Sequence, residues 1–495
     1  MYMAGLKANI IGAGVGGLAT AIRLSKLGFS VHVFEANDFP GGKINSKSIG
    51  SYRFDMGPSI FTEPHLIDEL FDLYSKTDID FKYKLLSESC RYFFCDSHSF
   101  ILPVGKDKVA LKIASELGED QKNVFSYLER MEKNYNAVAP VFIHVSLHKI
   151  KHLFNKNILF AFKRFFSYGL FRSMNKVNNT SFNNPKTVQI FNRYATYNGS
   201  DPYQTPGMLN IISHLELNLG PALPKGGMVA ITKTLYNLAL ESGVKFSFNE
   251  KVEKISYSNN IISGVQTAKA IYPSEIVVSN MDVHFTYKKL LSDFSFHPEK
   301  ILSQEKSSSA IVFYWGIKKQ FSELGLHNIF FAEDYEKEFK SIFKTKEMVS
   351  DPTIYINITS KIEKDDAPIN SENWFVMVNA PINSGQNWDE IVKNTRHAIL
   401  KKLSKALKVD IETLIEVEDF MDPRKIENLY SGKQGSIYGN ASNSKSAAFY
   451  RHPNFSKKLK GLYFSGVTVH PGGGIPLALN SAKIVERCVK EDFSV

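Results

Sequence analysis

The chain contains 495 residues, of which 43% are hydrophobic and 22% carry a charge. This length exceeds that of one ordinary domain, and the composition supplies a large apolar core, so a disordered or fibrous protein is excluded. Aromatic residues make up 13% of the chain, with 37 Phe and 22 Tyr. This content favours either an apolar ligand or simply an aromatic-rich core.

The cysteines and the N-terminus indicate the compartment. Cys90, Cys95 and Cys488 fit neither a disulfide framework nor a metal-binding motif, so we expect a reducing compartment and no metal site. The chain begins without a charged, apolar, cleavable leader, and no apolar run approaches the roughly 18 residues that cross a bilayer. We therefore expect a cytoplasmic protein that can rest on a membrane without crossing it.

The first predicted elements are a strand at residues 9–11, a glycine turn, a helix, and a second strand that ends at Glu35. The turn has the spacing G-x-G-x-x-G, whose glycines permit a tight turn, close approach of a pyrophosphate, and close packing of helix on strand. Glu35 follows Gly17 by 18 residues and can bind both ribose hydroxyls of an adenosine. The helix N-terminus adds an anion site. The candidate cofactor residues here are Gly12, Ala13, Gly14, Gly16, Gly17 and Glu35.

Two further glycine turns follow, in "FPGGKINS" and "YRFDMGPSIF". Each could be an ordinary turn. Three such turns within the first 60 residues favour a long cofactor, FAD, over a nicotinamide dinucleotide. Lys43 can neutralise pyrophosphate charge. The candidate cofactor residues of these turns are Gly41, Gly42, Lys43, Met56, Gly57, Pro58 and Ser59.

The next distinctive segment is basic and aromatic. No acidic residue occurs between Glu132 and Asp201, and the ten basic residues in that interval account for the whole net charge of +10. Apolar residues at helical spacing alternate with these cations over residues 149–176, which favours an interfacial helix on a membrane surface. A core-facing helix with a solvated basic face is the alternative. Because no nucleic-acid-binding motif accompanies the cations, we expect no nucleic-acid partner. The ten residues are Lys133, Lys149, Lys151, Lys156, Lys163, Arg164, Arg172, Lys176, Lys186 and Arg193.

The second half of the chain contains predicted strands and a glycine-rich end. Residues 308–317, 352–360 and 373–381 are rich in aromatic and β-branched residues, which suits a sheet that walls an apolar tunnel. Near the C-terminus, "VTVHPGGGIPLALNSAKI" places three glycines before a helix that begins near Pro476. Such glycines let the backbone come close to another group.

These motifs together resemble the phytoene-desaturase-type carotenoid desaturases and isomerases, which are FAD proteins of the amine-oxidase-like structural group. The resemblance runs along nearly the whole chain, from the fingerprint and "PGGK" through "FDMGPSIFTEP" and "HLELNLGPALPKGGM" to "FYRHPNFSKKLKGLYFSGVTVHPGGGIPLALNSAKIV". It is closest to the hydroxycarotenoid 3,4-desaturase branch, on the basis of "GGM" and "HPGGGIPLALNSAKI".

The resemblance implies further cofactor contacts. A strand at residues 461–465 would bring the glycine loop under the flavin, and the following helix would aim its N-terminus at the flavin N1–C2=O locus. A glycine turn that merely stabilises a terminal helix is the alternative. The backbone at Val252 would pair with adenine, and His470 would be a polar neighbour of the isoalloxazine ring. The implied C-terminal contacts are Gly466, His470, Gly474, Ile475 and Pro476.

The implied reaction removes a hydride and a proton from adjacent carbons of a carotenoid, and FAD is then reoxidised by dioxygen or a quinone. The polar candidates for the proton step or for a substrate hydroxyl are Arg193, Tyr197, His214 and Glu216. Each also has a structural interpretation, because Arg193 can pair with Glu216 and His214 can be an interior histidine. The enzyme would collect its substrate from the bilayer through the segment at residues 149–176.

The fold class expected is α/β, with a Rossmann-like FAD-binding domain, a mixed-sheet substrate domain and a helical membrane-contact region. The FAD domain would use residues 1–75, 225–300 and 435–495, the helical region 76–224, and the substrate domain 301–434. The rival functions are a phytoene desaturase proper, a carotenoid cis-trans isomerase, an amine or protoporphyrinogen oxidase, and a non-catalytic carotenoid carrier.

Overall fold

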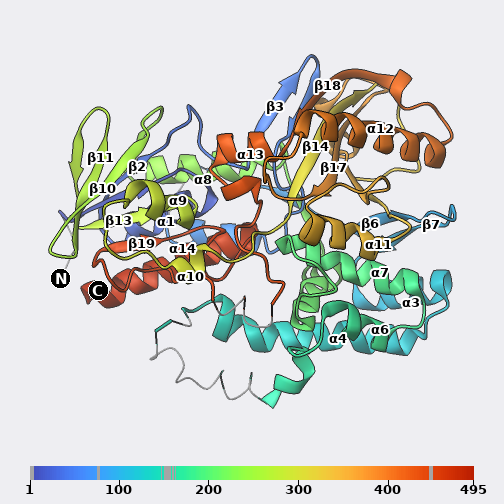
Figure 1. Ribbon diagram of the computed structural model, residues 1–495, viewed down its shortest axis with the longest axis horizontal. Coiled ribbons are helices and arrows are strands. Elements are labelled where there is room, and N and C mark those ends of the chain that lie inside the picture. Colours follow the sequence, from blue (N-terminus) through green and yellow to red (C-terminus); the bar gives the residue numbers. More distant parts are fainter. Residues whose placement is uncertain are drawn as a thin grey trace.

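A computed structural model describes residues 5–74, 79–146, 148, 149, 158, 161, 163–444, 447 and 450–494. Figure 1 shows two sheet-containing parts side by side, with both chain ends at the outer side of one of them. Helices from the first half of the chain lie below the other part.

A parallel five-stranded sheet forms the first part, in the order β19-β13-β1-β2-β9. Its central strands are buried on both faces, as parallel strands covered by helices must be. Helices α1, α8 and α14 supply much of the apolar cover. The strands come from three distant stretches of chain, namely β1 (Lys7–Ile11) with β2 (Ser30–Phe34), β9 (Lys245–Ser247) with β13 (Ile276–Ser279), and β19 (Leu462–Phe464). The helices are α1 (Val15–Lys26), α8 (Val229–Glu241) and α14 (Ile475–Phe493).

A smaller antiparallel sheet covers the same part, formed by β10 (Val252–Ser258), β11 (Ile261–Thr267) and β12 (Ile271–Pro273). The hairpin of β3 (Ser46–Ile49) and β4 (Tyr52–Asp55) leads from this part toward the second one.

A seven-stranded mixed sheet forms the second part, in the order β18-β14-β17-β16-β15-β6-β7. Along β14, alternate side chains enter two different cores, as the two-residue period of a strand requires: Phe313 and Trp315 face one, and Val312 and Tyr314 the other. Helix α12 (Trp388–Leu407) covers the first of these faces. The strands are β6 (Glu88–Phe93), β7 (Ser99–Pro103), β14 (Ser309–Ile317), β15 (His327–Phe330), β16 (Ile354–Asn357), β17 (Glu372–Ala380) and β18 (Ile415–Met421).

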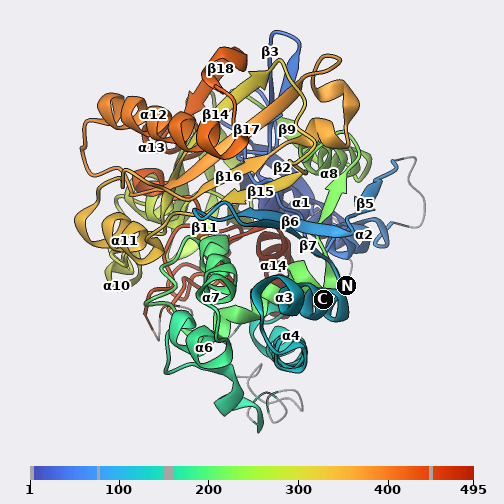
Figure 2. The ribbon, with the colours of Figure 1, turned by 90° about the vertical axis from the view of Figure 1, so that its right-hand side faces the viewer.

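The helices of the first half gather on the opposite face of this sheet (Figure 2). They are α3 (Lys106–Leu117), α4 (Gln121–Val138), α6 (Met174–Ser181) and α7 (Pro185–Asn192). Three of them begin with side-chain caps, because Asp120 accepts from Asn123 N, Ser173 from Lys176 N and Asn184 from Lys186 N. The other elements are α2 (His65–Phe71), β5 (Tyr83–Leu85), β8 (Ala222–Pro224), α9 (Val283–Phe285), α10 (Glu299–Leu302), α11 (Tyr335–Lys340) and α13 (Pro423–Tyr430).

The predicted strands at residues 308–317, 352–360 and 373–381 are confirmed as β14, β16 and β17, and the C-terminal helix begins at Ile475. The sheet also includes β6 and β7, which lie within residues 76–224, where only helices were expected. Most of the predicted interfacial helix lies outside the described residues; Phe165–Tyr168 form a 3-10 turn. Within the described parts of the chain, every helix is too short or too polar to cross a bilayer.

Candidate functional site

The N-terminal glycine turn is built so that side chains do not fit. Gly12 has φ +94°, and its N–H donates to Phe34 O at 2.8 Å. A Cβ on Gly17 would lie 2.2 Å from the carbonyl oxygen of Gly12. Gly14 is the N-cap residue of helix α1. Among the described residues, no side chain hydrogen-bonds to this helix N-terminus, so its backbone amides are available to an anion.

Glu35 lies at the end of β2 and is 7% exposed. Its carboxylate accepts from Ala13 N at 2.8 Å and from Asn37 N at 2.9 Å. The Glu35 carbonyl accepts from Glu250 N at 2.9 Å, and this contact brings the start of β10, at Val252, to the same edge of the sheet. The predicted ribose and adenine contacts therefore lie near each other.

The second glycine turn packs against the first, and the third packs against the second. Gly41 N donates to Ala13 O at 2.8 Å, and a Cβ on Gly42 would lie 3.6 Å from Cα of Gly14. A Cβ on Gly57 would lie 1.9 Å from the carbonyl oxygen of Lys43. The five consecutive residues 56–60 are half-buried rather than buried. The turns therefore border accessible space.

The C-terminal loop reaches the same place. A Cβ on Gly16 would lie 3.1 Å from Cα of Gly466, and Asn280 Nδ2, beside both glycines, donates to Ser465 O at 3.0 Å. Gly466 N donates to Ser481 Oγ of α14 at 2.7 Å. Gly474, with φ +113°, precedes Ile475 and Pro476 at the start of α14, and a Cβ there would meet no atom within 4 Å. This open position at a helix N-terminus suits a bound anionic or polar group.

Three cations hydrogen-bond to the chain at residues 437–440: the half-buried Lys43 of the second glycine turn, and the buried Lys306 and Arg451. Lys43 Nζ donates to Ile437 O at 2.6 Å, Lys306 Nζ to Asn440 Oδ1 at 2.6 Å, and Arg451 Nη2 to Asn440 O at 3.1 Å. Burial lowers the pKa of both lysines to about 8 and that of Arg451 to about 10.

None of these three cations forms an ion pair within the described residues, and Nη1 of Arg451 has no hydrogen-bond partner there. Arg451 Nε lies 3.2 Å from the Cβ position of Gly472, so this guanidinium adjoins the C-terminal glycine loop. The carboxylate of Asp282 supplies one nearby negative charge to the two lysines, and a cofactor with a pyrophosphate fits the remaining positive charge of this site. Sequence reasoning missed Lys306 and Arg451, although Arg451 stands in the quoted "FYRHP".

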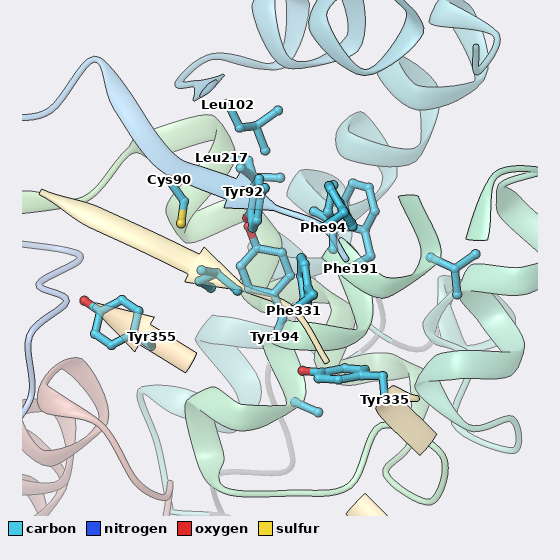
Figure 3. Close-up of a cluster of buried hydrophobic side chains, with 14 of the residues drawn as sticks. Cys90, Tyr92, Phe94, Leu102, Phe191, Tyr194, Leu217, Phe331, Tyr335 and Tyr355 are labelled. Carbon is cyan, nitrogen blue, oxygen red and sulfur yellow. The ribbon is translucent and has the colours of Figure 1, made fainter. Parts of the chain in front are cut away.

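The catalytic candidates Arg193 and Glu216 form a buried ion pair with a separation of 2.7 Å. Glu216 also accepts from Ser89 Oγ at 2.5 Å and from the hydroxyl of Tyr197. Arg193 donates to the hydroxyl of Tyr92 at 2.9 Å, and Figure 3 shows Tyr92 within the surrounding aromatic cluster. The pair is charge-balanced and hydrogen-bonded, which supports the structural interpretation of both residues.

The two histidine candidates hydrogen-bond to other residues. His214 Nδ1 contacts Asn218 Nδ2 at 2.9 Å, and burial lowers its pKa. His470 is fully buried, with Nε2 2.9 Å from Val145 O and its ring against Phe142. The His470 ring thus contacts the chain around residues 142–148, and its backbone hydrogen-bonds to His452 and Asn454. Burial lowers its pKa to about 3.

The glycine turns, the terminal carboxylate of β2 and the returning C-terminal loop define a dinucleotide-binding protein of the flavoprotein type. The family model described as "Flavin containing amine oxidoreductase" matches residues 15–312, and the chain belongs to this family. It is an oxidoreductase, and its cofactor is FAD, as the motifs predicted.

Individual relatives extend over the whole chain. A 1-hydroxycarotenoid 3,4-desaturase of Flavobacterium sp. (strain P99-3) is 49% identical, covering 97% of this chain and 98% of that protein. A phytoene desaturase of Fusarium fujikuroi is 28% identical, covering 98% and 89%. The crystallised cyclohexylamine oxidase of Brevibacterium oxydans has the same fold, with a TM-score of 0.63 at 13% identity, covering 99% and 100%. The predicted family resemblance and fold class are confirmed.

Proposed function

We propose that this protein is an FAD-dependent carotenoid desaturase that introduces a C=C bond near the end of an acyclic 1-hydroxycarotenoid, at the 3,4 position. The observation that carries the proposal is the 49% identity, over nearly the full length of both chains, to a protein named 1-hydroxycarotenoid 3,4-desaturase. The glycine loops described above fit the FAD cofactor that such a reaction requires.

FAD, when bound, accepts the hydride that leaves the substrate. The protein's part is to hold an apolar polyene against the cofactor and to remove the accompanying proton. The large sheet meets the cofactor turns through aromatic side chains: the Tyr314 hydroxyl donates to Met56 O at 3.0 Å, and the Tyr314 ring packs against Phe375 at 5.8 Å. An apolar wall next to the predicted flavin position suits a carotenoid.

We infer that the protein associates peripherally with a membrane surface through residues 149–176, from the cytoplasmic side, and that a quinone or dioxygen reoxidises the cofactor. The described part of that segment supports a lipid contact: Phe171 is 67% exposed, its neighbour Arg172 is an exposed cation, and Lys163 of the same segment is exposed as well. Lys149, by contrast, pairs with Glu491 at 2.9 Å.

We also propose how the chain is divided into domains. Residues 1–75, 225–300 and 435–495 contain every strand of the parallel sheet and would form the FAD domain. Residues 301–434 would form the substrate domain, together with β6 and β7. The rest of residues 76–224 would form the helical, membrane-facing region.

The test is incubation of the flavoprotein in liposomes with 1-hydroxylated and unhydroxylated carotenoids, followed by absorption and mass analysis. The proposal expects the 1-hydroxylated substrate to lose two hydrogens. Reaction of unhydroxylated phytoene alone would indicate a phytoene desaturase proper, and a changed absorption at constant mass an isomerase. Pigment that is bound but unchanged would indicate a carrier, and reaction only with amines or protoporphyrinogen another oxidase.

A further inference from the structure

A chain of hydrogen-bonded side chains leads from a predicted cofactor turn into the large sheet. The Ser59 hydroxyl donates to the Tyr355 oxygen at 2.8 Å, and the Tyr355 oxygen lies 2.8 Å from Nδ1 of His327. Ser59 follows the glycine turn at Gly57, whereas Tyr355 lies on β16 and His327 begins β15. Figure 3 shows the Tyr355 hydroxyl directed away from Tyr335 and the other aromatic rings.

The donors around His327 fix the direction of these hydrogen bonds. Asn357 Nδ2, which can only donate, donates to Leu326 O at 3.1 Å and lies 3.3 Å from Nδ1 of His327. Nδ1 is therefore an acceptor, and the proton of the neutral imidazole resides on Nε2. Burial lowers the pKa of His327 to about 3, which keeps the ring neutral. Ser59 thus donates to Tyr355, and Tyr355 donates to His327.

The last residue of this hydrogen-bonded series, His327, lies at a surface hollow. His327 lines a hollow of about 390 Å3, whose wall also includes Ser89, Glu88, Arg91 and Lys361. These charged and hydroxyl groups make the hollow suitable for water. The hollow is not bordered by the glycine turns, so it is separate from the predicted cofactor position. Ser59 thus belongs to a predicted cofactor turn, and His327 lies in the wall of a hollow that is separate from that turn.

We propose that Ser59, Tyr355 and His327 form a relay that carries the proton released by desaturation from the apolar interior to this hollow. The inference rests on the proposed function, because each desaturation releases one proton for each hydride that FAD accepts. Loss of the hydride leaves a delocalised cation on the polyene, and such a cation is acidic enough to give its proton to a hydroxyl group.

The steps balance as follows. The C–H bond next to the cation breaks, its electron pair forms the new C=C bond, and its proton goes to Ser59 Oγ. The Ser59 hydroxyl proton moves to the Tyr355 oxygen, the Tyr355 proton moves to Nδ1 of His327, and the Nε2 proton passes to water. Each group ends with its original number of protons. Rotation of the two hydroxyls and exchange of the imidazole tautomer restore the starting directions.

The surroundings of His327 favour passage of the proton over its retention. Burial is the main cause of the low pKa of His327, and the positive charge of the Arg193 guanidinium lowers it further. An imidazole protonated on both nitrogens would be a second buried positive charge near Arg193, whose own carboxylate partner, Glu216, is already engaged. The ring therefore releases one proton as it receives another.

The test measures single-turnover desaturation of a 1-hydroxylated carotenoid by the FAD-loaded protein in liposomes, in H2O and in D2O. Tyr355→Phe removes the relaying hydroxyl and keeps the ring. We expect the wild type to react more slowly in D2O, and Tyr355→Phe to be at least about tenfold slower and to lose the solvent isotope effect. Tyr335→Phe is the matched control, because its buried hydroxyl has no partner among the described residues, and it should retain both the rate and the isotope effect.

A second pair of variants keeps the test independent of the tyrosine. Ser59→Ala should lose rate as Tyr355→Phe does, and Ser59→Thr, which keeps a hydroxyl, should recover most of it; FAD content and thermal stability identify variants that are merely misfolded. A wild-type rate in Tyr355→Phe, a retained isotope effect in that variant, or equal rates for the two Ser59 variants would overturn the relay. A wild type that forms no double bond would overturn the proposed function itself, and the relay with it.

Discussion

Gly16 and Gly466, near opposite ends of the chain, lie against each other. A Cβ on Gly16 would lie 3.1 Å from Cα of Gly466 and 2.8 Å from Nδ2 of Asn280. The first turn of α1 and the loop after β19 therefore form one surface, which includes the start of α14 and the amides that we propose bind phosphate. The proposed cofactor site requires that the two ends of the chain meet.

Gly16→Ala should weaken FAD binding. The added methyl group must push Gly466 or Asn280 away, so the amides of the turn lose their alignment, and we expect the bound FAD per protein to fall at least about fivefold. Gly118→Ala is the control, because Gly118 also has an unusual conformation (φ +69°) but no atom lies within 4 Å of its Cβ position. That variant should lose stability, by about 1 kcal/mol, and keep its FAD. Equal FAD content in the two variants would contradict the account.

The affinity for FAD should fall as the pH rises above about 8. In the protein without cofactor, burial lowers the pKa of Lys43 and Lys306 to about 8, and a nearby phosphate raises the pKa of a lysine. FAD therefore binds the protonated lysines more tightly. Above the lowered pKa the affinity should fall by up to about tenfold per lysine per pH unit, and below it the affinity should be constant.

Fluorescence titration of the apoprotein with FAD over this pH range measures the effect. Lys43→Met should bind FAD more weakly at neutral pH and show a shallower dependence, since one titrating group is gone. An affinity that is independent of pH in the wild type would show that no phosphate lies near these lysines.

The Arg193–Glu216 pair should contribute to stability. Glu216→Gln leaves a buried guanidinium without its carboxylate, and we expect the free energy of unfolding to fall by about 3 kcal/mol. Glu412→Gln is the control, because the Glu412–Arg396 pair, at 2.7 Å, is largely exposed and should change stability by less than about 1 kcal/mol. Denaturant unfolding of the holoprotein measures both. Glu216→Gln with unchanged stability and lost turnover would instead assign this pair a catalytic role.

Membrane association should depend on the exposed aromatic and basic residues near residue 171. Phe171→Ser combined with Arg172→Glu should weaken binding to liposomes containing anionic lipid by about fivefold or more, because each cation near such a surface contributes about 1 kcal/mol. Ile369→Ser is the control, since Ile369 is 92% exposed but lies outside this segment. Co-sedimentation at low and high salt measures the difference, and equal binding of the two variants would contradict the membrane proposal.

The sequence predicts those features that depend on neighbouring residues. The turn at Gly12–Gly17, the carboxylate of Glu35 and the start of α14 at Ile475 all follow from local spacing and backbone conformation. Contacts between distant segments have no such local pattern. For this reason the buried cations Lys306 and Arg451 were missed.

The same reason explains the remaining differences. Strand β6 joins the large sheet through a parallel pairing with β15, far along the chain, so residues 76–224 were expected to be helical. The aromatic residues that surround Arg193 and Glu216 form no local sequence pattern that would predict the burial of this ion pair. The hydrogen bond between Ser59 and Tyr355 likewise joins two segments that carry no shared motif.

The most direct measurement is the mass of the carotenoid recovered after the FAD-loaded protein has acted on a 1-hydroxylated substrate in liposomes. A flavin held between both ends of the polypeptide and facing an aromatic wall should yield a product lighter by two hydrogens, with its absorption moved to longer wavelength. Recovery of the substrate at its starting mass, with any electron acceptor supplied, would contradict it.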